Sequence, residues 1–328
     1  MTSTRPIAVI VNTRCRANRK DPAMVERLRR GVGEQGLFFA TANDESLIEA
    51  ATRIHRAQPS TLAIHGGDGT LHLTMTRVIQ AYGGARLPRI VVLRGGTQNT
   101  IANACGIAGQ AERVLQDAVA RHHAGAPFVE LERDILRIGP APSAHEPRGA
   151  SASREDLYGF IFGNGFVHQF LAEYYSRGEP SQWNALVTLA VGCASVAVRG
   201  AVARRMFRRF HGRVTVDGEV WPATDFTGVV GSTIEQVGLG FRPFVRCDER
   251  PGTFHLLGIT TGALGFALEL PSIRLGLPLN ERKILNGVFR SAVFEAEESL
   301  DYMVDGDIRA ARHRLELGVG PRVRFVVR

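Results

Sequence analysis

The chain has 328 residues, of which 44% are hydrophobic and 22% charged, so it is long enough to form two globular domains with buried cores. Its formal net charge of +8 is compatible with nucleic acid, anionic lipid head groups or nucleotide phosphates as partners. The four cysteines, Cys15, Cys105, Cys193 and Cys247, lie far apart without a CxxC pair, which argues against a zinc site or a disulfide framework. We expect four isolated reduced thiols.

The N-terminus runs directly into an apolar stretch at residues 6–12 and lacks the basic, apolar and small-residue segments of a signal peptide. We therefore expect a cytoplasmic protein whose mature chain begins here. Positive charge is concentrated further along, because no acidic residue lies between Glu179 and Asp217. The basic residues of this interval are Arg199, Arg204, Arg205, Arg208, Arg209 and Arg213.

The first part of the chain alternates short apolar runs with amphipathic stretches. Strands are predicted at 6–12, 36–41, 61–67 and from 89, because these runs are rich in β-branched residues and show no polar alternation. Helices are predicted after each of them, over 21–32, 43–57, 70–82 and 100–107. This order predicts an open, mostly parallel α/β sheet, whose ligands bind at the carboxyl ends of the strands.

The pattern changes near residue 128 to short strand-like segments separated by turn residues, which is typical of an antiparallel β domain. We predict an N-terminal domain over 1–128, a larger β-rich domain over 129–310, and a C-terminal strand over 311–328 that returns to the N-terminal domain. The Pro-, Ala- and Ser-rich stretch 139–155 is predicted to be a flexible hairpin loop.

One long basic amphipathic helix is predicted over 183–210, inside the β-rich domain. Its uncharged part, residues 185–198, is shorter than the roughly 18 residues that a membrane-spanning helix needs. Its basic part is interleaved with Met206, Phe207 and Phe210. Two interpretations stay open: the arginines are solvated, or the Arg199 to Arg213 segment docks on an anionic membrane surface, which we favour. Nucleic acid is not expected, because no nucleic-acid motif accompanies this segment.

Two glycine-rich turns follow predicted strands. In "HGGDGT" the glycines let backbone N–H groups approach a phosphate, and Thr70 adds a hydroxyl at the start of the next helix. Asp68 has two interpretations: it binds Mg²⁺ beside a nucleotide, or it caps the following helix. The second turn, "RGGTQN", again joins adjacent glycines to Thr97. Two such turns at one edge of a sheet favour a phosphate site.

The ordered set "GGDGT", "GGTQN" and "VDGD" resembles the diacylglycerol kinase catalytic-domain family of lipid kinases, which includes bacterial lipid kinases and the sphingosine and ceramide kinases. The resemblance covers nearly the whole chain, whereas "GGDGT" alone is shared with NAD kinases and phosphofructokinases. It implies an N-terminal α/β nucleotide-binding domain like those of NAD kinase and phosphofructokinase. It also implies an antiparallel β-sandwich-like domain, with the active site in the cleft between the two.

The same resemblance implies roles for individual residues. Asp307 matches the general base that takes the proton of the lipid hydroxyl, and Asp68 and Asp134 match acidic residues that face Mg²⁺. A more literal "DGE" at 217–219 is expected to be a β-turn without catalytic function. The residues implied for ATP are Asn12, Thr41, Gly66, Gly67, Gly69, Thr70, Gly96, Thr97 and Asn99.

The chain departs from the family pattern at three places. The first loop, usually "NPxSG", is "NTRCR" here, so that only Asn12 carries over, although its arginines offer charged contacts to phosphate. The base is Asp307 where the family has glutamate. In the segment "CDERPGTFH", Pro251 and His255 stand where a structural Mg²⁺ would have acidic ligands, so we expect that metal to be absent.

These observations together predict an ATP- and Mg²⁺-dependent kinase that phosphorylates a hydroxyl of a diacylglycerol-like or sphingoid/ceramide-like membrane lipid. Such an enzyme would be peripheral on the inner face of the membrane. Two alternatives stay open. One is a kinase of a soluble acceptor such as NAD, and the other is a degenerate member that binds lipid or nucleotide without catalysis.

Overall fold

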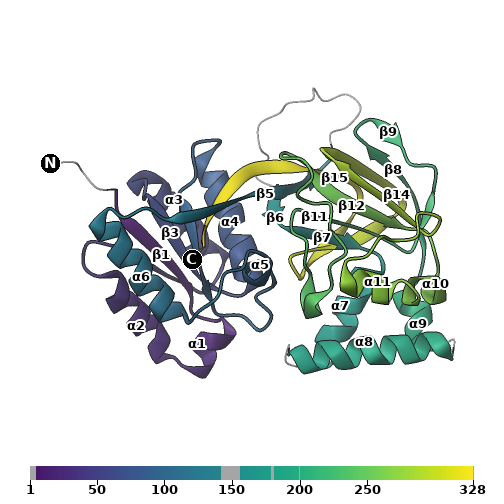
Figure 1. Cartoon of the computed structure of the whole chain (residues 1–328), viewed down its shortest axis with the longest axis horizontal. Helices are drawn as coiled ribbons and strands as arrows, with labels where there is room; N and C mark the ends of the chain where they lie inside the picture. Colours follow the sequence, from purple (N-terminus) through teal and green to yellow (C-terminus); the bar gives the residue numbers. More distant parts are fainter. Residues whose placement is uncertain (1–4, 142–155, 179–180, 199, 328) are drawn as a thin grey trace. The chain divides into compact units, whose positions relative to one another are not determined.

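The computed structural model describes residues 5–141, 156–178, 181–198 and 200–327 (Figure 1). The chain divides into two units. The first comprises residues 1–133 together with 321–328, and the second comprises residues 134–320. Each unit is described by itself.

The first unit is an α/β domain with a parallel sheet in the order β2-β1-β3-β4, to which the end of β15 adds next to β4. Its strands are β1 (Ile7–Asn12), β2 (Leu37–Thr41), β3 (Thr61–Gly66), β4 (Arg89–Arg94) and the start of β5 (Val129–Pro140). Its helices are α1 (Arg16–Lys20), α2 (Ala23–Val32), α3 (Asp44–Ala57), α4 (Asp68–Tyr82), α5 (Thr100–Ala104) and α6 (Ala111–Ala124).

The sheet of the first unit is buried on both faces, which explains its continuous apolar strands. Helices α2 and α6 cover one face (Figure 1), and there Leu28 of α2 and Leu115 of α6 pack against Val9, Val11 and Val91. Helices α3 and α4 pack against each other over the other face. A capping box starts α3: the Asn43 side chain accepts the Ser46 N–H, and the Ser46 hydroxyl accepts the Asn43 N–H. The predicted parallel α/β domain is confirmed.

The second unit is rich in antiparallel strands, as predicted from the turn-separated segments. Its strands are β6 (Leu157–Gly159), β7 (Ile161–Asn164), β8 (Phe210–Val216), β9 (Glu219–Val220), β10 (Asp225–Phe226), β11 (Gly228–Ser232), β12 (Phe254–Ile259), β13 (Ile284–Phe289), β14 (Ser291–Val304) and β15 (Asp307–Val327). Its helices are α7 (Phe166–Ser176), α8 (Gln182–Ala197), α9 (Ala201–Met206), α10 (Ala263–Ala267), α11 (Leu270–Leu275) and the 3₁₀ turn η1 (Gly238–Gly240).

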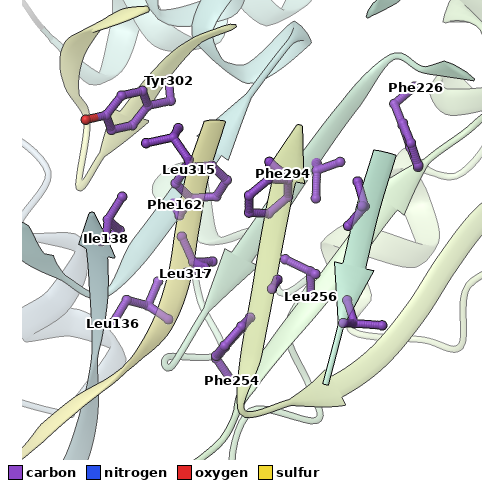
Figure 2. Close-up of a cluster of buried hydrophobic side chains, with 14 of the residues drawn as sticks. Leu136, Ile138, Phe162, Phe226, Phe254, Leu256, Phe294, Tyr302, Leu315 and Leu317 are labelled. Atoms are coloured by element: carbon purple, nitrogen blue, oxygen red, sulfur yellow. The ribbon is translucent and has the colours of Figure 1, made fainter. Parts of the chain in front are cut away.

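A hydrophobic core rich in aromatic side chains lies among the strands of the second unit (Figure 2). Phe162 of β7 stacks on Phe294 of β14 with ring centroids 5.3 Å apart. The ring centroid of Tyr302 lies 6.0 Å from that of Phe162. Such aromatic pairs contribute about 0.5–1.5 kcal/mol beyond the burial of their area. Leu136 of β5 and Leu317 of β15 complete the same layer. The core therefore joins strands from both ends of the unit.

The single helix predicted over 183–210 is wrong. Helix α8 ends at Ala197, α9 begins at Ala201, and Phe210 already belongs to β8. The chain turns at Gly200, whose N–H donates to the Ser195 carbonyl, while the Ser195 hydroxyl accepts the N–H of Ala203 at 2.9 Å. These bonds divide the helical segment. No helix in the part of the chain that the structure describes is long and apolar enough to cross a membrane.

Two sequence predictions concern residues outside the described part. Most of the hairpin loop predicted over 139–155 lies there, although β5 and β6 on either side of it do pair antiparallel, with Leu136 opposite Gly159. Arg199, the first arginine of the basic segment, also lies outside the described residues.

Candidate functional site

The residues predicted to bind nucleotide lie along one edge of the parallel sheet in the first unit. Strand β1 pairs with β2 on one side and with β3 on the other, so the strand order reverses between β1 and β3. The carboxyl ends of these two strands are Asn12 and Gly66. Open α/β sheets bind their ligands at such a reversal point.

The two glycine turns at this edge pack backbone against backbone. The N–H of Gly95 donates to the Gly66 carbonyl at 2.8 Å. A Cβ atom on Gly96 would lie 2.5 Å from the Cα of Gly67, and one on Gly67 would lie 3.0 Å from the Cα of Gly96. Only glycine allows the two turns to approach this closely.

Gly69 has a different environment from these glycines. It lies in the first turn of α4, and a Cβ atom built on it meets nothing within 4 Å. Packing inside the protein does not require glycine here, and alanine would favour the helix by about 1 kcal/mol. An open position at the N-terminus of a helix of this length can admit a phosphate group against the backbone.

Gly69→Ala is therefore expected to leave the unfolding temperature unchanged or higher while weakening ATP binding by about tenfold or more, equivalent to about 1.4 kcal/mol. Thermal unfolding and calorimetric titration with ATP measure the two effects. Gly262→Ala is the matched control, because Gly262 has a φ of −77° and also has open space around its Cβ position. Equal ATP affinity of Gly69→Ala and wild type would contradict the assignment.

Asp68 joins the two turns through its carboxylate. Its Oδ2 accepts the N–H of Thr100 at 3.0 Å, and its Oδ1 accepts the N–H of Ile101 at 3.1 Å. Burial raises the pKa of Asp68, while these two backbone hydrogen bonds lower it. Asp68 thus caps α5, the helix after the second turn, and not the helix that it begins.

The Asp68 carboxylate also accepts hydrogen bonds from the Thr100 hydroxyl and from its own backbone N–H. No cluster of three or more His, Cys, Asp or Glu side chains suited to a metal occurs among the described residues. Mg²⁺ beside a nucleotide needs only one or two protein carboxylates, because phosphates and water supply the other ligands.

The altered first loop is tied to both turns. Asn12 Nδ2 donates to the Thr70 hydroxyl at 2.8 Å, and Arg16 Nη1 donates to the Thr97 hydroxyl at 3.2 Å. Asn18 Nδ2 donates to the Asn12 carbonyl at 2.7 Å. Arg16, at the start of α1, therefore brings a positive charge to the second turn where the family pattern has small residues.

Sequence reasoning missed His65 and Asn18, which lie beneath this loop. His65 is fully buried, its Nδ1 lies 3.1 Å from the Leu93 carbonyl, and its Nε2 lies 3.2 Å from Asn18 Oδ1. Burial lowers the pKa of His65. The one available signal was a polar residue at the end of an otherwise apolar strand.

The remaining nucleotide candidates have local contacts. Thr41 ends β2, is buried, and donates its hydroxyl to the Val11 carbonyl at 3.4 Å. Asn99 has a positive φ of 49°. Its Oδ1 accepts the Gly96 N–H at 3.0 Å and its Nδ2 donates to the Gly96 carbonyl at 3.1 Å. The Asn99 side chain thus closes the second turn on itself.

The acidic candidates Asp134 and Asp307 belong to the second unit. Asp134 Oδ2 accepts the N–H of Gly252 at 2.7 Å. Asp307 begins β15, is partly exposed, and pairs with Arg309 at 2.6 Å. Burial raises the pKa of Asp307, and the nearby charge of Arg309 lowers it.

Within "VDGD" the two aspartates have different surroundings. Asp305 and Gly306 have φ angles of 49° and 86°, as in a tight type I′ hairpin turn. The buried Asp305 carboxylate accepts the N–H groups of Phe160 and Ile161, at 3.0 and 2.8 Å for its Oδ1. Asp305, which the sequence analysis did not single out, therefore fixes the turn from which Asp307 extends.

The earlier "DGE" forms a turn of the same kind, as predicted. Asp217 and Gly218 have φ angles of 47° and 91°, between β8 and β9. Asp217 Oδ1 accepts the N–H groups of Arg290 and Ser291 at 2.9 and 2.8 Å. Glu219 is exposed.

The segment expected to lack a structural metal is held by hydrogen bonds. Nδ1 of the buried His255 accepts the N–H of Arg246 at 3.3 Å, and its Nε2 lies 2.6 Å from Asn286 Oδ1. Glu249 pairs with the Arg246 side chain at 2.6 Å. Burial lowers the pKa of His255, which favours the neutral ring in this network.

The first unit matches a known protein family. Residues 6–130 match the family model of the diacylglycerol kinase catalytic domain. The resemblance inferred from the sequence is thereby confirmed, and the first unit carries a domain of a kinase family. No curated protein matches the chain.

Solved structures similar to the whole chain include two from Bacillus anthracis str. Sterne. One, of a presumed diacylglycerol kinase, has a TM-score of 0.71 at 13% identity, over 100% of this chain and 99% of that one. The other, of a diacylglycerol kinase, has a TM-score of 0.64 at 12% identity, over 100% of this chain and 98% of that one. At this identity the likeness establishes the fold.

Proposed function

We propose that the protein is an ATP-dependent lipid kinase, which transfers the γ-phosphoryl group of ATP to a hydroxyl of a diacylglycerol-like or sphingoid/ceramide-like membrane lipid. The observation that carries the proposal is the close packing of the two glycine turns, which Asp68 joins. A Cβ atom added to Gly96 or to Gly67 would lie only 2.5 or 3.0 Å from the Cα of the other glycine. This pair lies inside the residues that match the kinase family. The choice of a lipid acceptor rests on that family.

The first unit fits ATP through its own groups. Gly69 leaves open space at the start of α4, and the hydroxyls of Thr70 and Thr97 are held in place by Asn12 and Arg16. The Arg16 guanidinium supplies positive charge beside the second turn. When bound, Mg²⁺ would neutralise charge on the phosphate oxygens. Asp68, and in our proposal Asp134, would contact it.

Asp307 is proposed as the general base of the second unit. A carboxylate whose pKa is raised by burial is a better proton acceptor than one in water. Asp307 would take the proton of the lipid hydroxyl, whose oxygen forms the new bond to the γ-phosphorus as ADP leaves. The ion pair with Arg309 orients the carboxylate and keeps it ionised. The enzyme would act peripherally at the inner face of the membrane.

The test supplies labelled ATP and Mg²⁺ with either a host lipid extract or NAD, and separates the products by thin-layer chromatography. Wild type is expected to label a lipid and not NAD. Asp68→Asn is expected to reduce transfer at least about 100-fold, because it removes an acceptor for α5 and a carboxylate beside the phosphates. Asp117→Asn, an exposed aspartate of α6, is the control.

Two outcomes would contradict the proposal. Label transferred to NAD alone would make the protein a kinase of a soluble acceptor. Tight ATP binding without transfer to any lipid would favour a degenerate family member that binds without catalysis. The altered first loop "NTRCR" and the aspartate in place of a glutamate base are the reasons for considering this alternative.

A further inference from the structure

Helix α8 exposes large apolar side chains to solvent. A surface helix normally presents charged residues to solvent and apolar residues to its domain. The exposed face of α8 instead carries Trp183 and Leu186, 70% and 49% exposed, followed by Ala190, Ala194 and Ala197. No Asp, Glu, Lys or Arg occurs in α8.

The inward face of α8 carries the small and polar residues. Ala185, Thr188, Gly192 and Ser195 are buried, together with one larger apolar residue, Val196. The Thr188 hydroxyl donates to the Asn184 carbonyl at 2.7 Å, and the Ser195 hydroxyl accepts the Ala203 N–H. Small residues let α8 lie close to its neighbours: a Cβ on Gly192 would be 3.5 Å from the sulfur of Met206. The two largest apolar side chains of α8 at the opposite face, Trp183 and Leu186, therefore remain exposed.

The elements around α8 extend this apolar surface. Helix α8 lies along the outer edge of the second unit, next to α7 and α9 (Figure 1), and α10 packs against it. Leu264 of α10 and Leu268, which directly follows α10, are 65% and 66% exposed. Large exposed apolar side chains on neighbouring helices are typical of a membrane or protein interface.

The charge of the residues around α8 favours a membrane as the partner of this surface. Arg204 and Arg205 of α9 are exposed, and α8 and α9 contain no acidic residue. Arg208 and Arg209 follow α9 at the surface, where Arg208 pairs with Glu298 and Arg209 with Asp225. Tryptophan and leucine beside arginines, without acids, is the composition of helices that lie in the interface of anionic bilayers.

We propose that the exposed face of α8 inserts into the head-group region of an anionic lipid bilayer, with Arg204 and Arg205 of α9 contacting the lipid phosphates. The insertion surface is thus an uncharged helix face, and the basic segment supports it electrostatically. The inference rests on the proposed function only in choosing a membrane as the occupant.

The test measures sedimentation with vesicles of equimolar phosphatidylglycerol and phosphatidylethanolamine. The double variant Trp183→Glu/Leu186→Glu is expected to bind these vesicles at least about tenfold more weakly than wild type. Ile48→Glu, an exposed apolar residue of α3 in the first unit, is the control and should bind as wild type does. Brominated lipids should quench Trp183, since Trp221 is buried, and Trp183→Phe should abolish that quenching.

Three results separate this inference from the proposed function. Equal vesicle binding by the double variant and wild type overturns the inference. Self-association of wild type that the double variant loses, without vesicle binding, also overturns it and makes the face an interface between copies. Vesicle insertion by wild type without phosphorylation of any lipid leaves the inference standing and removes the proposed function. If both hold, the double variant keeps its activity on monodisperse short-chain lipid and loses it on vesicles.

Discussion

Asp307→Asn is expected to lower kcat for lipid phosphorylation by about 10²–10⁴-fold. Asparagine has nearly the same shape and can keep an oxygen toward Arg309, but it cannot accept the proton of the lipid hydroxyl. ATP affinity should be unchanged, because every residue assigned to ATP lies in the first unit. Steady-state kinetics with lipid in mixed micelles and calorimetric titration with ATP measure the two quantities.

Three further variants test the same assignment. Asp307→Glu should keep most of the activity, because it restores the base that the family pattern has at this position. Asp301→Asn, an exposed aspartate of β14, is the control. Activity should fall as the pH is lowered through the raised pKa of Asp307, and Arg309→Gln should move that fall to higher pH, since Arg309 lowers the pKa. An Asp307→Asn protein with wild-type kcat would show that another group takes the proton.

Gly96→Ala is expected to damage both the fold and the nucleotide site. The new Cβ would lie 2.5 Å from the Cα of Gly67, where backbone opposes it and no flexible side chain can move away. Overpacking of this kind costs about 1–3 kcal/mol of unfolding free energy. Separation of the two turns should also abolish measurable ATP binding. Urea unfolding and calorimetric titration test both expectations.

Comparison with Gly69→Ala separates the effect of a clash between the turns from the effect of an added methyl group alone. Both variants add one methyl group to a glycine turn, but only the methyl group on Gly96 meets backbone. Gly69→Ala should lose ATP affinity at wild-type stability, whereas Gly96→Ala should lose both. A Gly96→Ala protein with a wild-type unfolding midpoint would contradict the packing of the turns.

Much of the fold could be predicted from local sequence. Runs such as "IAVIVN" are buried on both faces of the parallel sheet, so burial and β-propensity favour the same structure there. The division of 183–210 into α8 and α9 was missed, because it depends on bonds of Ser195 to Gly200 and Ala203 that no periodicity reveals. Helix α6 was also missed, although it covers the sheet beside α2.

The candidate site was predictable in its location and less so in its contacts. Two glycine turns after neighbouring strands of a parallel sheet must meet at one edge. The bond from Asp68 to Thr100 spans 32 positions in the sequence and depends on where α5 begins. The opposite surroundings of Asp305 and Asp307 likewise depend on the N–H groups of Phe160 and Ile161, which are distant in the chain.

Hydrogen exchange with and without ATP and Mg²⁺ tests whether the two glycine turns form one phosphate site. Amides in residues 66–70 and 95–99 are expected to become protected together on addition of ATP, and Gly69→Ala is expected to weaken the protection of both segments. Tight binding of ATP that leaves exchange in both segments unchanged would contradict it.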